Sequence, residues 1–286
     1  MKTVLITTDF SQRSTIAIQR GAALAKAQDW SLTLAHAVDS DQPTQLADTL
    51  QQQASALLES QATALQDEYA IRVNHAVLRG DPAEEIATAA ERLDVALIII
   101  GSQRRNLLRN TFVGTTAERI IRLSPKPVLV ARSIAEHYRK PVIALDLSEN
   151  ETSPLSAALE LELFDSDAAT VVFAFEANQF HLLRRAGSTR DELDNYLRTE
   201  KQRYQPKAEQ IVTQHDMKAA QAVLVATQYN IADTILETAA SHAADLLVVG
   251  SHRKRALQRL TLGSVSDVVL RQAGIDVLVV PPDPAD

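Results

Sequence analysis

The sequence VALIIIGSQRRNLLRNTFVGTT at residues 95–116 decides the fold, because a similar stretch, ADLLVVGSHRKRALQRLTLGSV, occupies residues 244–265. Each is an apolar run that ends in Gly-Ser and is followed by a basic loop. After the loop comes a second Gly, followed by Thr in the first stretch and by Ser in the second. The two glycines of each stretch are thirteen residues apart. A buried strand that ends at glycine, followed by a helix that begins at glycine, is typical of an anion site, since backbone amides and the helix N-terminus are accessible there.

Length and composition restrict the class of protein. The chain has 286 residues, enough for two domains of ordinary size, and a formal net charge of -7, which disfavours nonspecific nucleic-acid binding. It has no cysteine, which excludes disulfides and thiolate metal sites, and its seven histidines show no metal-ligand spacing. The N-terminal MKTVLITTDF has no signal-peptide pattern, and no apolar run approaches a membrane span. We expect a soluble cytoplasmic protein without nucleic-acid or membrane partners.

The first half alternates apolar runs with amphipathic segments. Runs rich in β-branched residues predict strands, and 3.6-residue periodicity with capping residues predicts helices. The predicted strands cover 3–8, 31–38, 71–78, 95–101 and 127–132, and the predicted helices cover 12–28, 44–68, 82–93 and 114–123.

The pattern restarts after a polar, basic segment. PVIALDLSENET at 141–152 repeats the shape of VLITTDFSQRST at 4–15, with Asp146 at the place of Asp9. Asp146 follows Asp9 by 137 residues and Gly250 follows Gly101 by 149, so the second half carries about twelve extra residues, which we place near 176–190. Further strands are predicted at 169–175, 219–226, 245–250 and 276–280, and helices within 188–215 and at 231–243 and 263–273.

This repeat predicts an α/β fold with two repeated, doubly wound, parallel five-strand sheets. The predicted domains are residues 1–133 and 141–286, joined by a linker at 134–140. Ligands of such sheets bind at the carboxyl ends of the strands, near the switch point of strand order. We therefore group Asp9 with Gly101 and Gly114 in the first half.

Taken together, these features resemble a tandem universal stress protein over nearly the whole length. The resemblance rests on Asp-x-Ser after the first strand of each half, the strands that end in Gly-Ser, the Gly-Thr or Gly-Ser helix starts and the closing VLV strands. It implies an adenine-nucleotide alpha-hydrolase-like fold in which the last strands, 127–131 and 276–280, meet. We expect two separate sheets packed as an intramolecular pseudo-dimer, and not one continuous ten-strand sheet.

One branch of that family binds ATP through Gly, two residues, Gly, nine residues, and Gly with Ser or Thr. In this chain the outer glycines match and arginine replaces the middle one. Arginine either fills the phosphate space or contacts the phosphates through its planar guanidinium. The predicted binding residues are Asp9, Val38, Gly101, Arg104, Gly114 and Thr115 in the first half, and Asp146, Gly250, Arg253, Gly263 and Ser264 in the second.

The resemblance also implies roles for side chains outside the glycine motif. Asp9 and Asp146 would contact the base or ribose, although each is equally suited to cap the following helix. Val38 would line the adenine pocket, with core packing as the alternative. Phe175 stands at the equivalent place in the second half, where its ring is expected to narrow the pocket. If one half binds nucleotide, the first is favoured, because it also keeps the Gly80-Asp81-Pro82 turn.

Three functions follow as hypotheses. The first is a stress-response regulatory protein that binds ATP, ADP or AMP and changes its protein partners; Mg²⁺ is expected only together with ATP. The second is an interaction protein of the same fold that binds no nucleotide. The third, slow ATP hydrolysis, ranks last because the sequence shows no general base, and we predict no catalytic residues. Pairing of two whole chains into a homodimer is left open.

Overall fold

A computed structural model describes residues 1–102, 115–134, 136–147, 152–177, 179–227, 230–251 and 262–282. Both basic loops, with Arg104, Gly114 and Arg253 of the predicted site, lie outside the described residues.

The elements of the first half follow the predicted order. They are β1 (Thr3–Thr7), α1 (Gln12–Ala27), β2 (Ser31–Val38), α2 (Thr44–Tyr69), β3 (Val73–Arg79), α3 (Pro82–Arg92), β4 (Leu97–Gly101), α4 (Thr116–Leu123) and β5 (Val128–Ala131). The predicted start of α3 is confirmed, since Asp81 caps it, Pro82 is its first residue and Gly80 has a φ of 148°.

The second half repeats this order with additions. It contains β6 (Pro141–Leu145), α5 (Ser153–Glu160), β7 (Thr170–Glu176), α6 (Phe180–Arg185), α7 (Arg190–Gln214), β8 (Ala222–Thr227), α8 (Ile231–Ser241), β9 (Leu246–Gly250), α9 (Ser264–Gln272) and β10 (Asp276–Val280), with short 3-10 turns at Ser166–Ala168 and Ala219–Gln221. Helices α5 and α6 were not predicted from the sequence.

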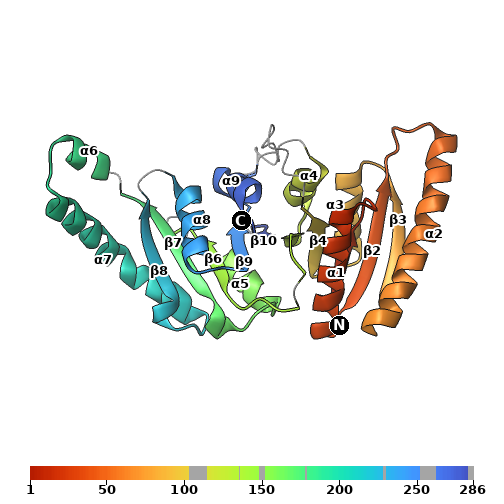
Figure 1. The fold of residues 1–286 in the computed structure, drawn as a ribbon, viewed down its shortest axis with the longest axis horizontal. Helices are drawn as coiled ribbons and strands as arrows, with labels where there is room; N and C mark the ends of the chain where they lie inside the picture. The colour runs from red at the N-terminus through yellow and green to blue at the C-terminus, as the bar shows by residue number, and fades with distance from the viewer. Residues whose placement is uncertain are drawn as a thin grey trace.

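The ten strands form one continuous sheet in the order β3-β2-β1-β4-β5-β10-β9-β6-β7-β8. Two five-strand parallel halves are confirmed, and so is the meeting of their last strands. The expectation that the halves keep separate sheets is wrong, because β5 and β10 pair antiparallel, with Leu129 opposite Leu278. Two closing strands with all residues buried satisfy each other's backbone groups in this way, and no apolar edge is exposed at the junction. In Figure 1, β10 lies in the middle of the molecule, where the second half meets the first.

Each half is doubly wound, with helices on both faces of the sheet. Alternate strand residues contribute to two cores: Leu97 and Ile99 of β4 belong to one, Ile98 and Ile100 to the other. The first core is covered by α1, α2, α5 and α7, and the second by α3, α4, α8 and α9. Both faces of the parallel strands are therefore buried, which explains their unbroken apolar runs.

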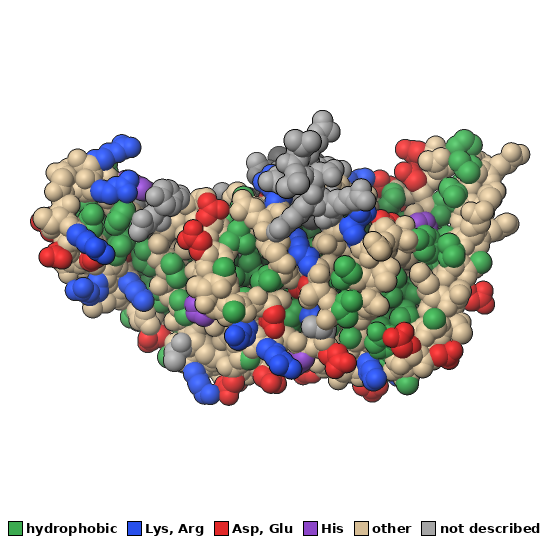
Figure 2. Space-filling model, in the orientation of Figure 1, with side chains coloured by type: hydrophobic (Ala, Val, Ile, Leu, Met, Phe, Trp, Pro, Cys, Tyr) green, Lys and Arg blue, Asp and Glu red, His purple; other side chains and the backbone are tan. Residues whose placement is uncertain are grey.

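The extra residues of the second half form α6 and the turn before α7. Helix α6 contacts α7, and together they form one end of the molecule, on the left in Figure 1. Basic side chains gather at this end in Figure 2, and Arg184, Arg185, Arg190 and Arg198 are exposed there. None of the helices in the described part of the chain is both long and apolar enough to cross a membrane.

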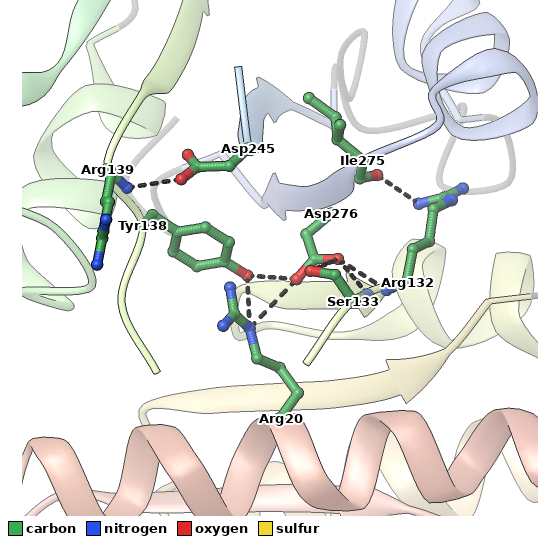
Figure 3. Close-up of polar contacts among 8 residues, drawn as sticks. All are labelled: Arg20, Arg132, Ser133, Tyr138, Arg139, Asp245, Ile275 and Asp276. Atoms are coloured by element: carbon green, nitrogen blue, oxygen red, sulfur yellow. Dashed lines mark hydrogen bonds and ion pairs between the residues drawn. The ribbon is translucent and has the colours of Figure 1, made fainter. Parts of the chain in front are cut away.

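A buried polar cluster joins the halves (Figure 3). The Asp276 carboxylate, at the start of β10, accepts a hydrogen bond from the Tyr138 hydroxyl at 2.7 Å and forms an ion pair with Arg20 Nε of α1 at 3.2 Å. Arg20 Nε donates its hydrogen bond to the Tyr138 oxygen at 3.1 Å. Arg20 and Asp276 are 0% exposed. Burial, followed by the charge of Asp276, raises the pKa of Tyr138 well above its ordinary value, so its hydroxyl stays a donor. This cluster ties α1, the connecting segment and β10 together.

Candidate functional site

A cavity of about 290 Å³ opens at the carboxyl ends of β1, β2 and β4. It lies where strand order reverses, because β1 is flanked by β2 on one side and β4 on the other. Its lining comes from β1 and its loop, β2, α1, α3, β4 and α4: Thr7, Thr8, Asp9, Arg13, Ser14, Ala35, His36, Ala37, Pro82, Ile86, Ile100, Gly101, Ser102, Thr116, Ala117 and Ile120. The volume is close to the lower end of the usual range for small-molecule sites, about 300 Å³.

The loop after β1 is held in an unusual conformation at the cavity. Phe10 has a φ of 58°, a left-handed conformation that a bulky residue rarely adopts. Its amide donates to Thr8 Oγ1 at 3.0 Å, and Thr8 Oγ1 in turn donates to Ser14 Oγ at 3.0 Å. Backbone strain of this kind persists only where neighbours over-determine it. The result is a loop with a fixed shape that presents Asp9.

Asp9 is an anion at neutral pH. Burial raises the pKa of its carboxyl, but hydrogen bonds from Ser11 and Ser14 and the charge of Arg13 outweigh burial and lower the pKa below its usual value. Its Oδ1 accepts the Ser11 amide at 3.0 Å. Asp9 lines the cavity, and its carboxylate is suited to accept from a hydroxyl or an amino group there.

His36 adds a second polar group from β2. Its Nδ1 donates to the Thr8 carbonyl at 2.8 Å, and its ring lies 4.6 Å from that of Phe10, measured between centroids. The carbonyl fixes the proton on Nδ1, so Nε2 of the neutral ring is an acceptor. His36 thus supports the loop that carries Asp9 and lines the cavity itself.

Gly101 lies where α1 approaches the end of β4. A Cβ at this position would be 2.7 Å from the Arg13 carbonyl oxygen and 3.1 Å from the Ser14 nitrogen. These are backbone atoms that cannot move independently of α1. Close packing of α1 therefore requires glycine here, and the same residue lines the cavity.

Helices α3 and α4 close the other side of the cavity. Thr115 caps α4, its Oγ1 accepting the Glu118 amide at 3.1 Å, while its neighbour Thr116 lines the cavity. Arg119 donates to the Asp81 carboxylate at 2.6 Å, and this hydrogen bond lowers the pKa of Asp81. The pair links the starts of α3 and α4.

The second half has a smaller, more apolar cavity of about 80 Å³. It is lined by Ala144, Leu145, Asp146, Ala174, Ile231, Ile235, Val249, Gly250, Gly263, Ser264, Val265 and Ser266. At equivalent positions Leu145 replaces Thr8, Ile231 replaces Pro82 and Val265 replaces Thr116. Larger or apolar side chains thus take the place of hydroxyl groups and a proline.

The structure brings some of the predicted residues together and separates others. Asp9 and Gly101 line the first cavity, and Asp146, Gly250, Gly263 and Ser264 line the second. Val38 is 3% exposed and is not among the described lining residues; its neighbour Ala37 is. The expectation that Phe175 narrows the second pocket is corrected, because its ring packs 5.1 Å from that of Tyr204 on the other face of the sheet.

Sequence reasoning did not assign Arg13, His36, Thr8 or Thr116 to the site. Two signals were available: Arg13 follows Asp9 by one helical turn, and Thr116 extends the Gly-Thr motif by one residue. His36 and Thr8 carried no local signal, because each becomes part of the site through strand pairing. The second half also keeps more of the α3 start than expected, since Asn230 caps α8 at the position equivalent to Asp81.

Both the sequence and the fold of this chain match those of known proteins. The model of the Universal stress protein family matches residues 1–132 and 137–281. The chain belongs to the universal stress protein family. It carries two copies of the family's domain, one in each half of the sheet.

Individual relatives agree with this assignment. A universal stress protein of Methanocaldococcus jannaschii is 27% identical over 154 residues, which cover 46% of this chain and 94% of that protein. The crystal structure of a universal stress protein from Archaeoglobus fulgidus aligns with a TM-score of 0.71 at 16% identity, covering 98% of both chains. A functionally unknown protein from Pseudomonas aeruginosa aligns with a TM-score of 0.66 at 20% identity, covering 99% of this chain and 93% of that one. At these identities the two structures show the fold alone.

The described residues contain no group of three or more His, Cys, Asp or Glu side chains arranged to hold a metal ion. The described residues that line the first cavity offer hydrogen bonding and charge: one anionic carboxylate, one guanidinium, one imidazole and several hydroxyls.

Proposed function

We propose that this universal stress protein is a regulatory protein that binds an adenine nucleotide in the cavity of its first half. The observation that carries the proposal is that one cavity of about 290 Å³ is lined by both Asp9, in the loop after β1, and Gly101, at the end of β4, on the two sides of the switch point. Asp9 is anionic and suited to accept hydroxyl or amino donors. Val38 remains part of the proposed site only as a support for Ala37.

The difference between the two halves supports a single nucleotide site. A cavity of about 80 Å³ holds far less than one of about 290 Å³, and the smaller one has Leu145 and Val265 in place of the hydroxyl residues Thr8 and Thr116. We infer that the second half does not accept a nucleotide in this conformation. Asp146, Gly250, Gly263 and Ser264 then preserve the shape of the fold rather than a ligand contact.

The proposed phosphate site is the segment between Gly101 and Thr115. Arg104 and Gly114 belong to it by sequence, and Arg253 is the counterpart of Arg104 in the second half. The residues on both sides, Ser102 and Thr116, line the cavity. A nucleotide whose base and ribose occupy the cavity would extend its phosphates toward this segment, and Mg²⁺ would accompany ATP.

The first test compares the two aspartates. Asp9→Ala should weaken adenosine and AMP binding about tenfold, because a hydrogen bond to a charged group is worth roughly 1.5–3 kcal/mol. Asp146→Ala, the matched change in the second half, should leave binding unchanged. Isothermal titration of the purified full chain measures both. An equal or larger effect at Asp146 would contradict the proposed single site.

The second test separates binding from obstruction at Arg104. If its guanidinium contacts phosphate, Arg104→Ala should weaken ATP about tenfold and adenosine hardly at all, and ATP binding should fall as salt rises. If the side chain blocks the site, Arg104→Gly should create binding where the unmodified chain shows none. Absence of binding in the unmodified chain and in both variants would favour an interaction protein that binds no nucleotide.

A further inference from the structure

Arg13 is the only Lys or Arg side chain that the structure places in the lining of the first cavity, within the described part of the chain. It lies in the first turn of α1, and its Nη2 is 3.6 Å from Asp9 Oδ2. The Arg13 side chain is 40% exposed and the Asp9 side chain 62%. Both charged groups are therefore accessible to a ligand that enters the cavity.

A ligand can replace either partner of the Asp9–Arg13 ion pair. Exposed pairs at this separation contribute little to stability, because water solvates both charges almost as well as they solvate each other. Nη2 is too far from Oδ2 for a hydrogen bond, so Asp9 leaves the donors of the guanidinium fork available. A planar guanidinium matches the geometry of a phosphate or carboxylate.

We propose that Arg13 is an anion-binding residue of the first cavity, and that Asp9 serves as its counter-ion until a ligand enters. A hydroxyl or amino group of the ligand donates a hydrogen bond to Asp9, and an anionic group of the same ligand accepts hydrogen bonds from Arg13. The proposal rests on the proposed function and narrows the ligand class: a nucleotide whose phosphate lies beside the donor group that Asp9 binds. Arg13 is then a specificity-determining residue that distinguishes nucleotides from nucleosides.

The second half provides an internal comparison. The position equivalent to Arg13 is Asn150, a neutral residue that lies outside the described residues. Among the described residues that line the second cavity there is no Lys or Arg. Anion binding should accordingly be confined to the first half. The competing interpretation is that the Asp9–Arg13 pair is a solvated surface pair that only supports the start of α1.

Inorganic phosphate is the direct probe, because it reports on Arg13 without requiring a base or ribose. In titrations of the full chain, Arg13→Gln should weaken phosphate binding about tenfold, since one charge-assisted contact is lost. Asp9→Asn should strengthen it about threefold, because the competing carboxylate is neutralised. Lys26→Gln, an exposed change in the last turn of the same helix, should have no effect. Arg13→Lys should retain part of the affinity, which separates loss of charge from loss of fold.

Adenosine is the second probe, and Asp9 should act on it with the opposite sign. Asp9→Asn should weaken adenosine binding, and Arg13→Gln should weaken adenosine binding less than it weakens phosphate binding. Phosphate binding that is undetectable in the unmodified chain, or equal in Arg13→Gln and Lys26→Gln, overturns the inference even if adenosine binds. If adenosine does not bind but the phosphate results are as expected, the proposed function is contradicted and the anion site is still supported.

Discussion

Asp276→Ala should reduce the free energy of unfolding by about 3–5 kcal/mol, the usual cost of removing one partner from a buried ion pair. Besides Arg20 and Tyr138, the carboxylate accepts the Arg132 amide at 2.7 Å and the Ser133 amide at 2.9 Å. Without it, the Arg20 guanidinium is left as an uncompensated charge at 0% exposure. Its Nη1 and Nη2 already lack hydrogen-bond partners among the described residues, so the hydroxyl and ring of Tyr138, both neutral, are the printed contacts that remain beside it.

Urea unfolding followed by circular dichroism measures this effect, with free energies extrapolated to water. The matched control is Asp167→Ala, which removes an ion pair with Lys218 at 3.0 Å whose side chains are about 70% exposed; it should cost less than about 1 kcal/mol. Similar losses in the two variants would show that the buried cluster contributes no more than a surface pair.

A double variant tests whether the cost comes from the unpaired charge. Arg20→Met combined with Asp276→Leu removes both charges and leaves apolar side chains of similar size. It should be less destabilised than Asp276→Ala, because desolvated ion pairs are expensive to keep as well as to break. A double variant at least as unstable as the single one would instead assign the stability to the hydrogen bonds of Asp276 with the connecting segment.

Phe173→Ala should also cost about 3–5 kcal/mol, the usual range for a fully buried phenylalanine. Phe173 is 0% exposed in β7, within the core that α5 and α7 cover. His36 occupies the equivalent position in β2 but is only half-buried and lines the first cavity. His36→Ala should cost about 1 kcal/mol, mainly its hydrogen bond to the Thr8 carbonyl.

The two substitutions are a matched pair within one chain, measured by the same urea unfolding. Phe173→Leu should recover more than half of the loss of Phe173→Ala, because most of the apolar volume returns. Equal costs at His36 and Phe173 would mean that the two equivalent positions are equally well packed, contrary to the difference in their burial.

The sequence alone determined most of the elements and the repeat. Unbroken apolar runs such as 97–101 and 246–250 predict strands buried on both faces, and Gly80-Asp81-Pro82 predicts the start of α3; both depend only on local chemistry. That Asp9 and Gly101 lie at the same site was also predictable, because the carboxyl ends of parallel strands meet at one edge of the sheet. Helix α6 was not, since its six residues have too few turns for a periodic signal.

Tertiary structure decided how the halves join and which half has room for a ligand. Val128, Leu129 and Val130 are apolar whether β5 packs against another sheet or extends its own, so only their antiparallel pairing with β10 distinguishes the two arrangements. Arg13 and His36 look like surface residues until α1 and β2 place them beside Asp9. The volume of each cavity depends on how side chains from several elements pack together. It is therefore set by contacts between residues that are distant in the sequence.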